Sequence, residues 1–294
     1  MGIFDFFKKK NKQEKAKNKE MILKILGVFT AFSLICLIYA HYEYTQLQVK
    51  KIVLKSKDIP KEFDGKKILF LADFQLDTWG RYNKKQMDRI VNLVNSQEKD
   101  IILVGGDYTN WTGKIDRFYN DLKRMEIPRY GTYAVLGNHD YNDVERNSQK
   151  LRELGYKLLV NENSDIKIGN EKIFIAGVDD YRKGKPDAEK ALNGIKKEDF
   201  AILLNHNPDY FEEMTDTEKE KADITLSGHT HGGQITFFGY ILHAEVKHKK
   251  YAYGMKESNG HKIYTTSGVG GGAFEMFIRF FAKPEIVVFE LRKN

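Results

Sequence analysis

Apolar and polar positions alternate in a regular pattern along most of the chain. From residue 66 onward, short apolar runs such as "KILFL", "IILV" and "TYAVL" predict buried strands. Between the first two runs, apolar residues recur at the spacing of one helix face, at Met87, Ile90, Val91 and Val94. Strands that alternate with amphipathic helices predict an α/β domain with partly buried sheets.

The second half of the chain continues this pattern with more strands. "DIKIGNEKIFIAG" predicts two strands joined by a Gly-Asn turn, and "AILL", "DITLS", "HKIYTT" and "EIVVFELR" predict further strands. Helices are expected around residues 114–125 and over residues 144–154. The sequence shows no internal repeat and no interdomain linker after residue 42, so we expect residues 42–294 to form one domain.

One segment of the chain lacks a polar face. Residues 21–40, "MILKILGVFTAFSLICLIYA", would span ~30 Å as a helix, which is the thickness of a bilayer core. A buried core helix is the alternative, but such a helix rarely lacks a polar face over this length. We therefore expect a transmembrane anchor over residues 21–41. A disordered basic tail over residues 1–20 would precede it, and a polar linker, "HYEYTQLQ", would follow it.

The distribution of lysine predicts the orientation of this anchor. Eight Lys lie in residues 1–24, against four in residues 41–60. This asymmetry favours a single-pass protein of the cell membrane with its N-terminus in the cytoplasm and its folded domain outside. A weak signal-peptidase site ends at Ala40, so cleavage stays open as an alternative to an uncleaved anchor.

The charge distribution and the cysteine content indicate which partners and which metal ligands the protein can have. The chain has a net charge of +7, but the eight Lys and three acidic residues of the first 24 positions account for +5, which leaves +2 for the rest. This distribution argues against nucleic acid as a partner, because a phosphate backbone usually requires a basic track. The single cysteine, Cys36, lies in the apolar segment, so a metal would be held by His, Asp, Asn or Gln. Such ligands favour Mn, Fe or Zn.

Several of the predicted strands end in polar residues that can bind metal. The carboxyl ends of strands are where ligands bind in open α/β folds. In an extended segment, residues two apart face the same way, so His229 and His231 would share a face, as would Asp73 and Gln75. The residues at the strand ends are Asp73, Gln75, Asp107, Asn138, His139, Asp140, His206, His229 and His231.

Each of these residues has an ordinary structural explanation when taken alone. A single Asp after a strand is usually a turn former or a helix cap, and a single buried His usually satisfies a hydrogen bond. Five separate strand ends that all present potential ligands are much harder to explain in this way. The combination therefore predicts a metal site.

In order along the chain, "DFQ", "GGD", "GNHD", "NH" and "GHTH" resemble the motifs of the calcineurin-like metallophosphoesterase superfamily. The resemblance covers residues 66–291 and is greatest to the membrane-anchored bacterial branch, which has been linked to enzymes similar to UDP-2,3-diacylglucosamine pyrophosphatase. It implies two packed mixed β-sheets flanked by helices in four layers, with two divalent metal ions at the rim. Mn is favoured for these ions, with Fe or Zn as alternatives.

The same resemblance implies a role for each residue of the motifs. Asp73, Gln75 and His231 would hold the first ion, and Asp107 would bridge to the second. The ligands of the second ion would be Asn138, His206 and His229. Two ions ~3.5–4 Å apart can activate a hydroxide and clamp phosphoryl oxygens during an in-line displacement. His139 would contact phosphate and protonate the leaving group.

Two positions depart from the family pattern. Gln75 stands where the family usually has His, and a carboxamide oxygen is a harder and weaker donor than imidazole. We expect looser binding or a shift toward Mn at the first site. Asn110 stands where some relatives place an acid that orients the catalytic His, which would weaken the proton-donor role of His139.

Candidate contacts for the substrate lie near the metal motifs. Arg81, Tyr108 and Tyr141 follow these motifs and are expected to bind substrate, as is Trp79, although packing at the rim explains them equally well. "GGGAFEMFIRFF", residues 270–281, places Phe274, Phe277, Ile278 and Phe281 at helical spacing, as either a core helix or a surface against acyl chains. Arg279 would then lie near headgroup phosphates, and residues 235–243 are a similar candidate surface.

These observations leave three functions open. The first is a membrane-anchored phosphohydrolase that cleaves a phosphodiester or pyrophosphate bond in a lipid headgroup, a lipid-linked nucleotide sugar or a wall polymer. The second is a nuclease. The third is a membrane sensor that binds phosphate without turnover, and the presence of Gln75 in place of His supports this hypothesis. The sequence does not indicate an oligomeric state.

Overall fold

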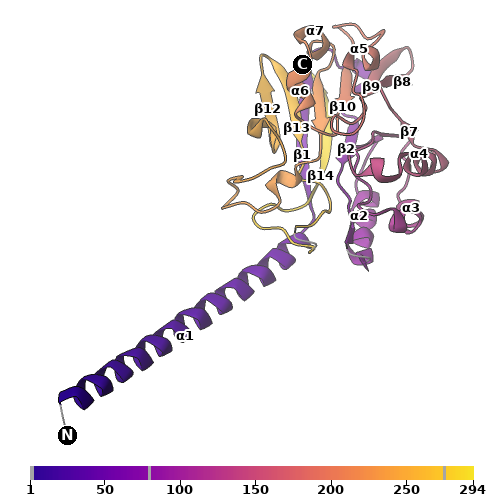
Figure 1. Cartoon of the computed structure of the whole chain (residues 1–294). Coiled ribbons are helices and arrows are strands. Elements are labelled where there is room, and N and C mark those ends of the chain that lie inside the picture. Colours follow the sequence, from indigo (N-terminus) through magenta and orange to yellow (C-terminus); the bar gives the residue numbers. More distant parts are fainter. Residues whose placement is uncertain (1–2, 79–80, 274–275) are drawn as a thin grey trace.

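The computed structural model describes residues 3–78, 81–273 and 276–294, with backbone alone for residues 3–13. Trp79 and Phe274, which the sequence places near the site, lie outside the described residues. Helix α1 (Ile3–Tyr44) projects from a domain whose sheets and shorter helices are shown in Figure 1.

Within the described residues, most strands belong to two six-stranded mixed sheets. In the first sheet, β2, β5, β6 and β7 run parallel to one another, whereas β14 is antiparallel to β2 and parallel to β1. Its spatial order is β1 (Gln48–Ser56), β14 (Glu285–Lys293), β2 (Lys67–Leu71), β5 (Ile101–Val104), β6 (Thr132–Ala134) and β7 (Lys157–Leu158).

The second sheet has a parallel centre and antiparallel edges. Its order is β12 (Gly254–Ser258), β13 (His261–Thr265), β11 (Ile224–Ser227), β10 (Ala201–Leu204), β9 (Glu171–Gly177) and β8 (Glu162–Ile168). A short ribbon pairs β3 (Asp77–Thr78) with β4 (Arg81–Tyr82). Single turns of 3₁₀ helix are η1 (Lys61–Phe63), η2 (Thr112–Lys114), η3 (Asp140–Asp143), η4 (His231–Gly233) and η5 (Lys249–Tyr251).

The two sheets pack face to face, and helices cover their outer faces. Phe70 and Leu103 of the first sheet share one buried cluster with Ile175 and Leu204 of the second. The outer face of the first sheet packs against α2 (Lys84–Asn95), α3 (Ile115–Leu122) and α4 (Val144–Glu153). The second sheet packs against α5 (Ala188–Ala191) and α6 (Tyr210–Glu213), with α7 (Asp216–Lys219) nearby. This arrangement confirms the predicted α/β fold of two mixed sheets flanked by helices.

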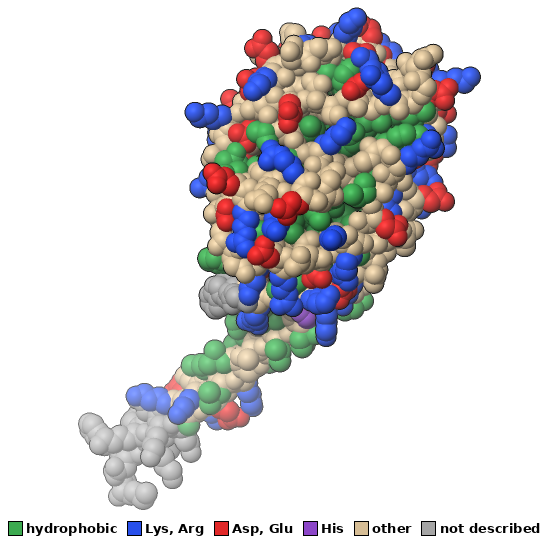
Figure 2. All heavy atoms as spheres, turned by 90° about the vertical axis from the view of Figure 1, so that its right-hand side faces the viewer, with side chains coloured by type: hydrophobic (Ala, Val, Ile, Leu, Met, Phe, Trp, Pro, Cys, Tyr) green, Lys and Arg blue, Asp and Glu red, His purple; other side chains and the backbone are tan. Residues whose placement is uncertain are grey.

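Helix α1 is longer and more continuous than the sequence predicts. Residues 14–44 are long and apolar enough to cross a bilayer, and none of the most apolar 18-residue window within them is buried by the rest of the molecule. Figure 2 shows its apolar side chains exposed between the basic residues of the tail and the base of the domain. The helix also includes most of the basic tail, which was expected to be disordered.

The expected polar linker after the anchor is replaced by a docked helix end. Glu43 and Tyr44 are buried. The backbone N–H of Arg279 donates to the carbonyl of Ala40 over 3.0 Å, and the Phe281 N–H donates to Glu43 Oε2 over 2.7 Å. Strand β1 begins four residues after the helix ends. The domain is therefore joined to α1 by a short connection, with no flexible linker between them.

In the aromatic segment over residues 270–281, the described residues 270–273 and 276–281 form no helix, contrary to one prediction. Its described residues form isolated bridges, between Ala273 and Met276 and between Ile235 and Phe280. Gly270 lies so close to the Phe74 carbonyl that a Cβ there would come within 1.7 Å of the oxygen. The glycines thus serve a close backbone crossing, and the spacing of the Phe residues does not reflect a helix face.

Candidate metal centre

The candidate residues lie in loops that follow β2, β5, β6, β10 and β11. The first two loops are joined by backbone hydrogen bonds, because the N–H groups of Asp73 and Phe74 donate to the carbonyls of Gly106 and Asp107 over 2.9 and 2.8 Å. The loop after β11 is bonded to the loop after β2, because the His229 N–H donates to both carboxylate oxygens of Asp73. Hydrogen bonds donated by backbone N–H groups thus connect loops from both sheets.

The local backbone at these loops is not extended, which corrects the argument from alternating faces. Asp73, Gln75, Asp107, His229 and His231 all have left-handed backbone conformations, with φ between 38° and 70°. Such conformations cost roughly 1–2 kcal/mol for a residue with a Cβ, so the surrounding hydrogen bonds must stabilise them. His229 and His231 still line one cavity, but turns place them there.

A cavity of about 750 Å³ opens over these loops. It is lined by six of the predicted residues, namely Gln75, Asp107, Asn138, His139, His229 and His231. Asp73 and His206 are buried behind them. Sequence reasoning missed other lining residues, including Asp77, Lys183 and Glu245.

The three predicted substrate contacts do not line this cavity. Tyr108 is fully buried, where its ring packs beside Phe74 and its hydroxyl donates to the Val135 carbonyl, so its predicted role in substrate binding is wrong. Arg81 is exposed on β4. The Tyr141 hydroxyl donates to the carboxylate of Asp179.

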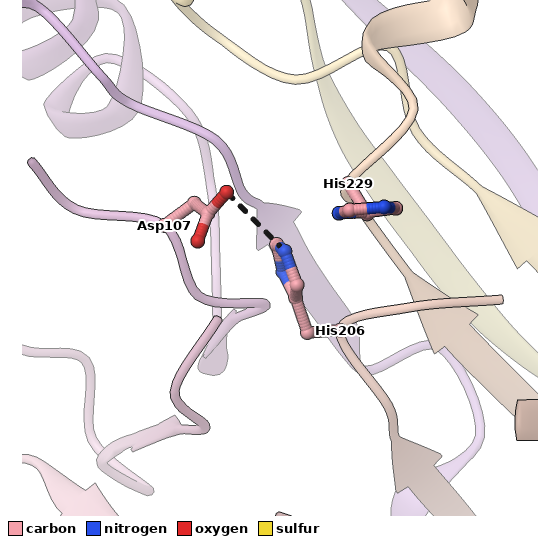
Figure 3. A group of neighbouring side chains, drawn as sticks. All are labelled: Asp107, His206 and His229. Carbon is pink, nitrogen blue, oxygen red and sulfur yellow. Dashed lines mark ion pairs between the residues drawn. The ribbon is translucent and has the colours of Figure 1, made fainter. Parts of the chain in front are cut away.

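Asp107, His206 and His229 form the centre of the site. Figure 3 shows the Asp107 carboxylate and the His206 ring pointing toward each other, with His229 beside them. Asp107 Oδ2 lies 3.3 Å from His206 Nε2, and potential ligand atoms of all three residues lie within 4.8 Å of one another. These atoms are close enough to share one cation.

Hydrogen bonds to backbone carbonyls select the free nitrogen of each imidazole. His206 Nδ1 lies 2.7 Å from the Gly105 carbonyl, and His229 Nε2 lies 3.2 Å from the Glu245 carbonyl. A carbonyl can only accept, so these nitrogens carry the protons. In the neutral rings, His206 Nε2 and His229 Nδ1 would therefore have the free lone pairs that metal binding requires.

Two buried atoms of this group fit a divalent cation. Within the part of the chain that the structure describes, Asn138 Oδ1 and His206 Nε2 are buried without any hydrogen-bond partner. Buried polar atoms are rarely left without a hydrogen bond, and His206 Nε2 has only the carboxylate of Asp107 nearby, so a bound cation is the simplest explanation for both atoms. A set of one carboxylate, one amide oxygen and two imidazoles suits Mn, Fe or Zn.

The residues expected to hold a first ion are arranged differently. Gln75 Nε2 donates to Asp107 Oδ2 over 2.9 Å. The guanidinium of Arg279 is fully buried, and it donates to the carbonyls of His231 and Gly270. Its Nη2 also lies 3.3 Å from His231 Nδ1, which must accept because a guanidinium can only donate. Arg279 is therefore part of the centre, and its predicted position near lipid headgroups is wrong.

Charges in this centre shift the pKa values of its members. Burial lowers the pKa of His206, but the negative charge of Asp107, whose Oδ2 lies 3.3 Å from His206 Nε2, raises it further, to about 10. Burial raises the pKa of Asp107, but the cationic His206 holds it below its usual range. Burial also raises the pKa of Asp73, to about 7. Without metal, Asp107 and His206 thus form a buried ion pair.

Asp140 supports the centre without lining the cavity. Its carboxylate accepts the backbone N–H groups of Asp107, Tyr108 and Gly137, over 2.9, 2.9 and 2.8 Å. It thereby fixes the loops after β5 and β6 to each other. Its place in "GNHD" was the signal in the sequence, although its supporting role could not be read there.

Asp77 organises the loop that contains Asn110. The Asp77 carboxylate accepts the N–H groups of Asn110 and Trp111 over 2.8 and 2.7 Å. The side-chain amide of Asn110 donates to the Asp77 carbonyl over 2.8 Å. The Asn110 amide is thus engaged with Asp77, which also lines the cavity together with His139.

Comparison with known proteins agrees with this geometry. The family described as calcineurin-like phosphoesterase matches residues 66–233. Over 268 residues, the chain is 31% identical to the uncharacterized metallophosphoesterase YkuE of Bacillus subtilis, covering 87% of this chain and 90% of YkuE.

Two further relatives are informative. Phosphodiesterase YaeI of Escherichia coli is 32% identical over 235 residues, which is 76% of this chain and 82% of YaeI. A transmembrane protein with a metallophosphoesterase domain from Danio rerio is 29% identical over 260 residues, which is 84% of this chain and 57% of that protein. The family match spans more than half of the chain and includes all the predicted metal ligands, from Asp73 to His231, so the chain belongs to the calcineurin-like phosphoesterase family and is a metal-dependent phosphoesterase.

Proposed function

We propose that this protein is a membrane-anchored phosphohydrolase that uses two divalent ions, with Mn favoured, to cleave a phosphodiester or pyrophosphate bond. The substrate would be a lipid headgroup, a lipid-linked nucleotide sugar or a wall polymer. The observation that carries the proposal is the convergence of Asp107, His206 and His229, beside a cavity lined by Asn138, in which Asn138 Oδ1 and His206 Nε2 are buried without a hydrogen bond. The finer resemblance to UDP-2,3-diacylglucosamine pyrophosphatase stays a prediction.

The two metal positions would differ in strength. Asp107, Asn138, His206 and His229 would hold one ion tightly. Ligand atoms of Asp107, His206 and His229 already converge, and Asn138, whose Oδ1 has no hydrogen-bond partner, lines the same cavity. Asp73, Gln75 and His231 would hold the other more weakly. The Gln75 amide donates to Asp107, and the charge of buried Arg279 opposes a second cation beside His231.

His139 is the candidate for contact with the phosphoryl group. Its backbone N–H donates to Asp107 Oδ1 over 2.9 Å, and the residue lines the cavity. An imidazole in this position can hydrogen-bond a phosphoryl oxygen and pass a proton to the departing oxygen. The ions would supply an activated hydroxide near neutral pH and neutralise charge on the phosphoryl group.

The anchor would place the domain outside the cytoplasm. Lys is concentrated before the apolar part of α1, which favours a cytoplasmic N-terminus. A membrane location and a cavity with metal ligands together favour a phosphorylated lipid or a wall polymer over a soluble metabolite.

A non-catalytic phosphate sensor is the second candidate. The hydrogen bond from Gln75 to Asp107 and the buried Arg279 favour it, because both weaken the first metal position. No observation of the structure favours the nuclease, and the small charge outside the tail weighs against it.

The decisive experiment uses the full chain in detergent, stripped of metal and reloaded with Mn, Zn or Fe. Hydrolysis of bis-p-nitrophenyl phosphate is followed for the parent, for Asp107→Asn and for His206→Ala, with His248→Ala as a histidine control outside the cavity. Turnover that depends on metal, is lost in the first two variants and is kept in the third supports the phosphohydrolase. Bound metal with no turnover for any ion supports the sensor. No bound metal overturns both proposals.

A further inference from the structure

The loop over residues 235–242, "ITFFGYIL", is largely exposed although it has no charged side chain. Phe237, Phe238, Tyr240 and Leu242 are 63%, 74%, 72% and 61% exposed. We call these eight residues the aromatic loop. An exposed apolar group of this kind indicates an interaction surface.

The aromatic loop has a defined conformation. Phe237 and Tyr240 exchange backbone hydrogen bonds of 2.9 Å in both directions, and they enclose a two-residue turn of Phe238 and Gly239. Both turn residues have positive φ, of 50° and 84°. The Thr236 N–H donates to the Phe280 carbonyl over 2.8 Å and ties the loop to the segment that holds the end of α1. The turn therefore presents the ring of Phe238 outward on a fixed base.

A chain of aromatic contacts connects this turn to α1. Tyr39 of α1 packs against Phe280 and Phe281, with ring centroids 5.2 and 5.4 Å apart. Phe281 packs against Phe238 at 4.7 Å, and Phe238 packs against Phe237 at 4.9 Å. In Figure 1 the orange and yellow loops lie at the edge of the domain where α1 joins it. The aromatic loop thus continues the apolar surface of α1.

Both ends of the aromatic loop lead into the cavity of the metal centre. Gly233 and Gln234 line the cavity before the loop, and His243 and Ala244 line it after the loop. Whatever contacts the exposed turn therefore lies next to the entrance of the cavity.

We propose that the aromatic loop is a second membrane-contacting element, which inserts beside α1 and places the cavity at the bilayer surface. The occupant of this surface is the lipid bilayer, because the loop continues a helix surface that is itself apolar and exposed. Aromatic side chains favour this interfacial depth. The inference rests on the proposed function and narrows it: the substrate is an amphiphile with its phosphodiester at the interface and its chains in the membrane.

Insertion is tested without reference to catalysis. The full chain with Phe238→Trp is reconstituted into vesicles of phosphatidylcholine and phosphatidylglycerol that carry bromine on their acyl chains. The fluorescence is compared with that of the parent, whose own Trp residues supply the background. Ile127→Trp, another exposed apolar position, is the matched control. Quenching for Trp at 238 and none for Trp at 127 is expected. Equal fluorescence with and without bromine at 238 overturns the proposal.

Access to substrate is tested with two probes that share one scissile bond. Hexadecyl p-nitrophenyl phosphate is carried in the vesicles, and bis-p-nitrophenyl phosphate is supplied in solution. Phe237→Ser combined with Phe238→Ser is expected to slow hydrolysis of the vesicle probe by about tenfold and to leave the soluble probe within about twofold. Equal effects on both probes, or no effect on either, contradict interfacial access.

Two other results have distinct meanings. A parent that hydrolyses neither probe, yet shows quenching at position 238, rejects the proposed function and keeps the membrane contact. A double variant that changes the oligomeric state in detergent, with no quenching at position 238, replaces the bilayer with a second copy of the chain and overturns the inference.

Discussion

The guanidinium of Arg279 donates to the backbone carbonyl of His231 over 2.6 Å. The backbone N–H of the same arginine donates to Ala40 at the end of α1. One buried residue therefore connects the helix that would cross the membrane with a predicted metal ligand.

Replacing this arginine should damage both the fold and the centre. Arg279→Met leaves the Gly270 carbonyl without a donor and leaves the His231 carbonyl with only the Gln234 N–H. An unpaired buried group costs about 1–3 kcal/mol. We expect a lower midpoint of urea unfolding and looser metal binding. Arg292→Met, which removes an exposed arginine, is the control and should change stability by less than about 1 kcal/mol. Equal stability of the two variants would contradict the structural role of Arg279.

Metal binding should release a proton from His206. Without metal, burial lowers the pKa of His206, but the negative charge of Asp107 outweighs this effect and the pKa is raised to about 10. The ring is therefore protonated at neutral pH. A ligand imidazole must be neutral, so binding displaces this proton. Affinity should rise by up to about tenfold per pH unit below pH 10. Calorimetry in two buffers of different ionisation enthalpy measures the released protons, and a result of zero at pH 7 would refute this ion pair.

Gln75→His should raise the metal content. The imidazole is a stronger ligand than the amide, and the change removes the donor that now pairs with Asp107. We expect the ratio of bound Mn to protein, measured by elemental analysis after dialysis, to increase in the variant. Gln75→Ala separates the two causes, since it removes the donor and adds no ligand. An unchanged ratio in Gln75→His would show that Arg279 alone limits the first position.

Asp140→Asn should lower the stability of the protein and weaken metal binding, although Asp140 does not line the cavity. The carboxylate accepts three backbone N–H groups, whereas an amide offers one oxygen, so at least one buried N–H loses its partner. A loss of roughly 2–4 kcal/mol in unfolding free energy is expected, together with weaker metal binding. Asp143→Asn is the control, because Asp143 caps α4 with a single bond of 3.3 Å and Asn caps helices equally well. Similar losses in both variants would contradict the supporting role of Asp140.

The sequence was sufficient for most of the strands but not for all of them. Runs such as Ile101–Val104 are apolar throughout because both faces of their sheet are covered. Strand β1 was not predicted, because Lys residues interrupt it and its partner, β14, lies more than 200 residues away. Pairing over such a distance leaves no local pattern.

The centre was predictable by residue type but not by conformation. The strand-end motifs identified Asp107 and His206, yet nothing in the residue pattern shows that Asp73 and His229 adopt left-handed conformations. Arg279 was misplaced because an arginine among aromatic residues is usually a surface group. Its burial depends on carbonyls supplied by distant loops. Tyr108 was misplaced because the direction of a side chain after a strand depends on the turn.

The rigid connection between α1 and the domain at Tyr44 affects how the protein would encounter its substrate. A domain on a flexible tether samples a volume, whereas one fixed to the end of a membrane helix moves with that helix in a plane. For an enzyme of this kind, the rate of encounter would follow the number of substrate molecules per unit area and the speed of lateral diffusion, so dilution of the bulk solution would leave it unchanged.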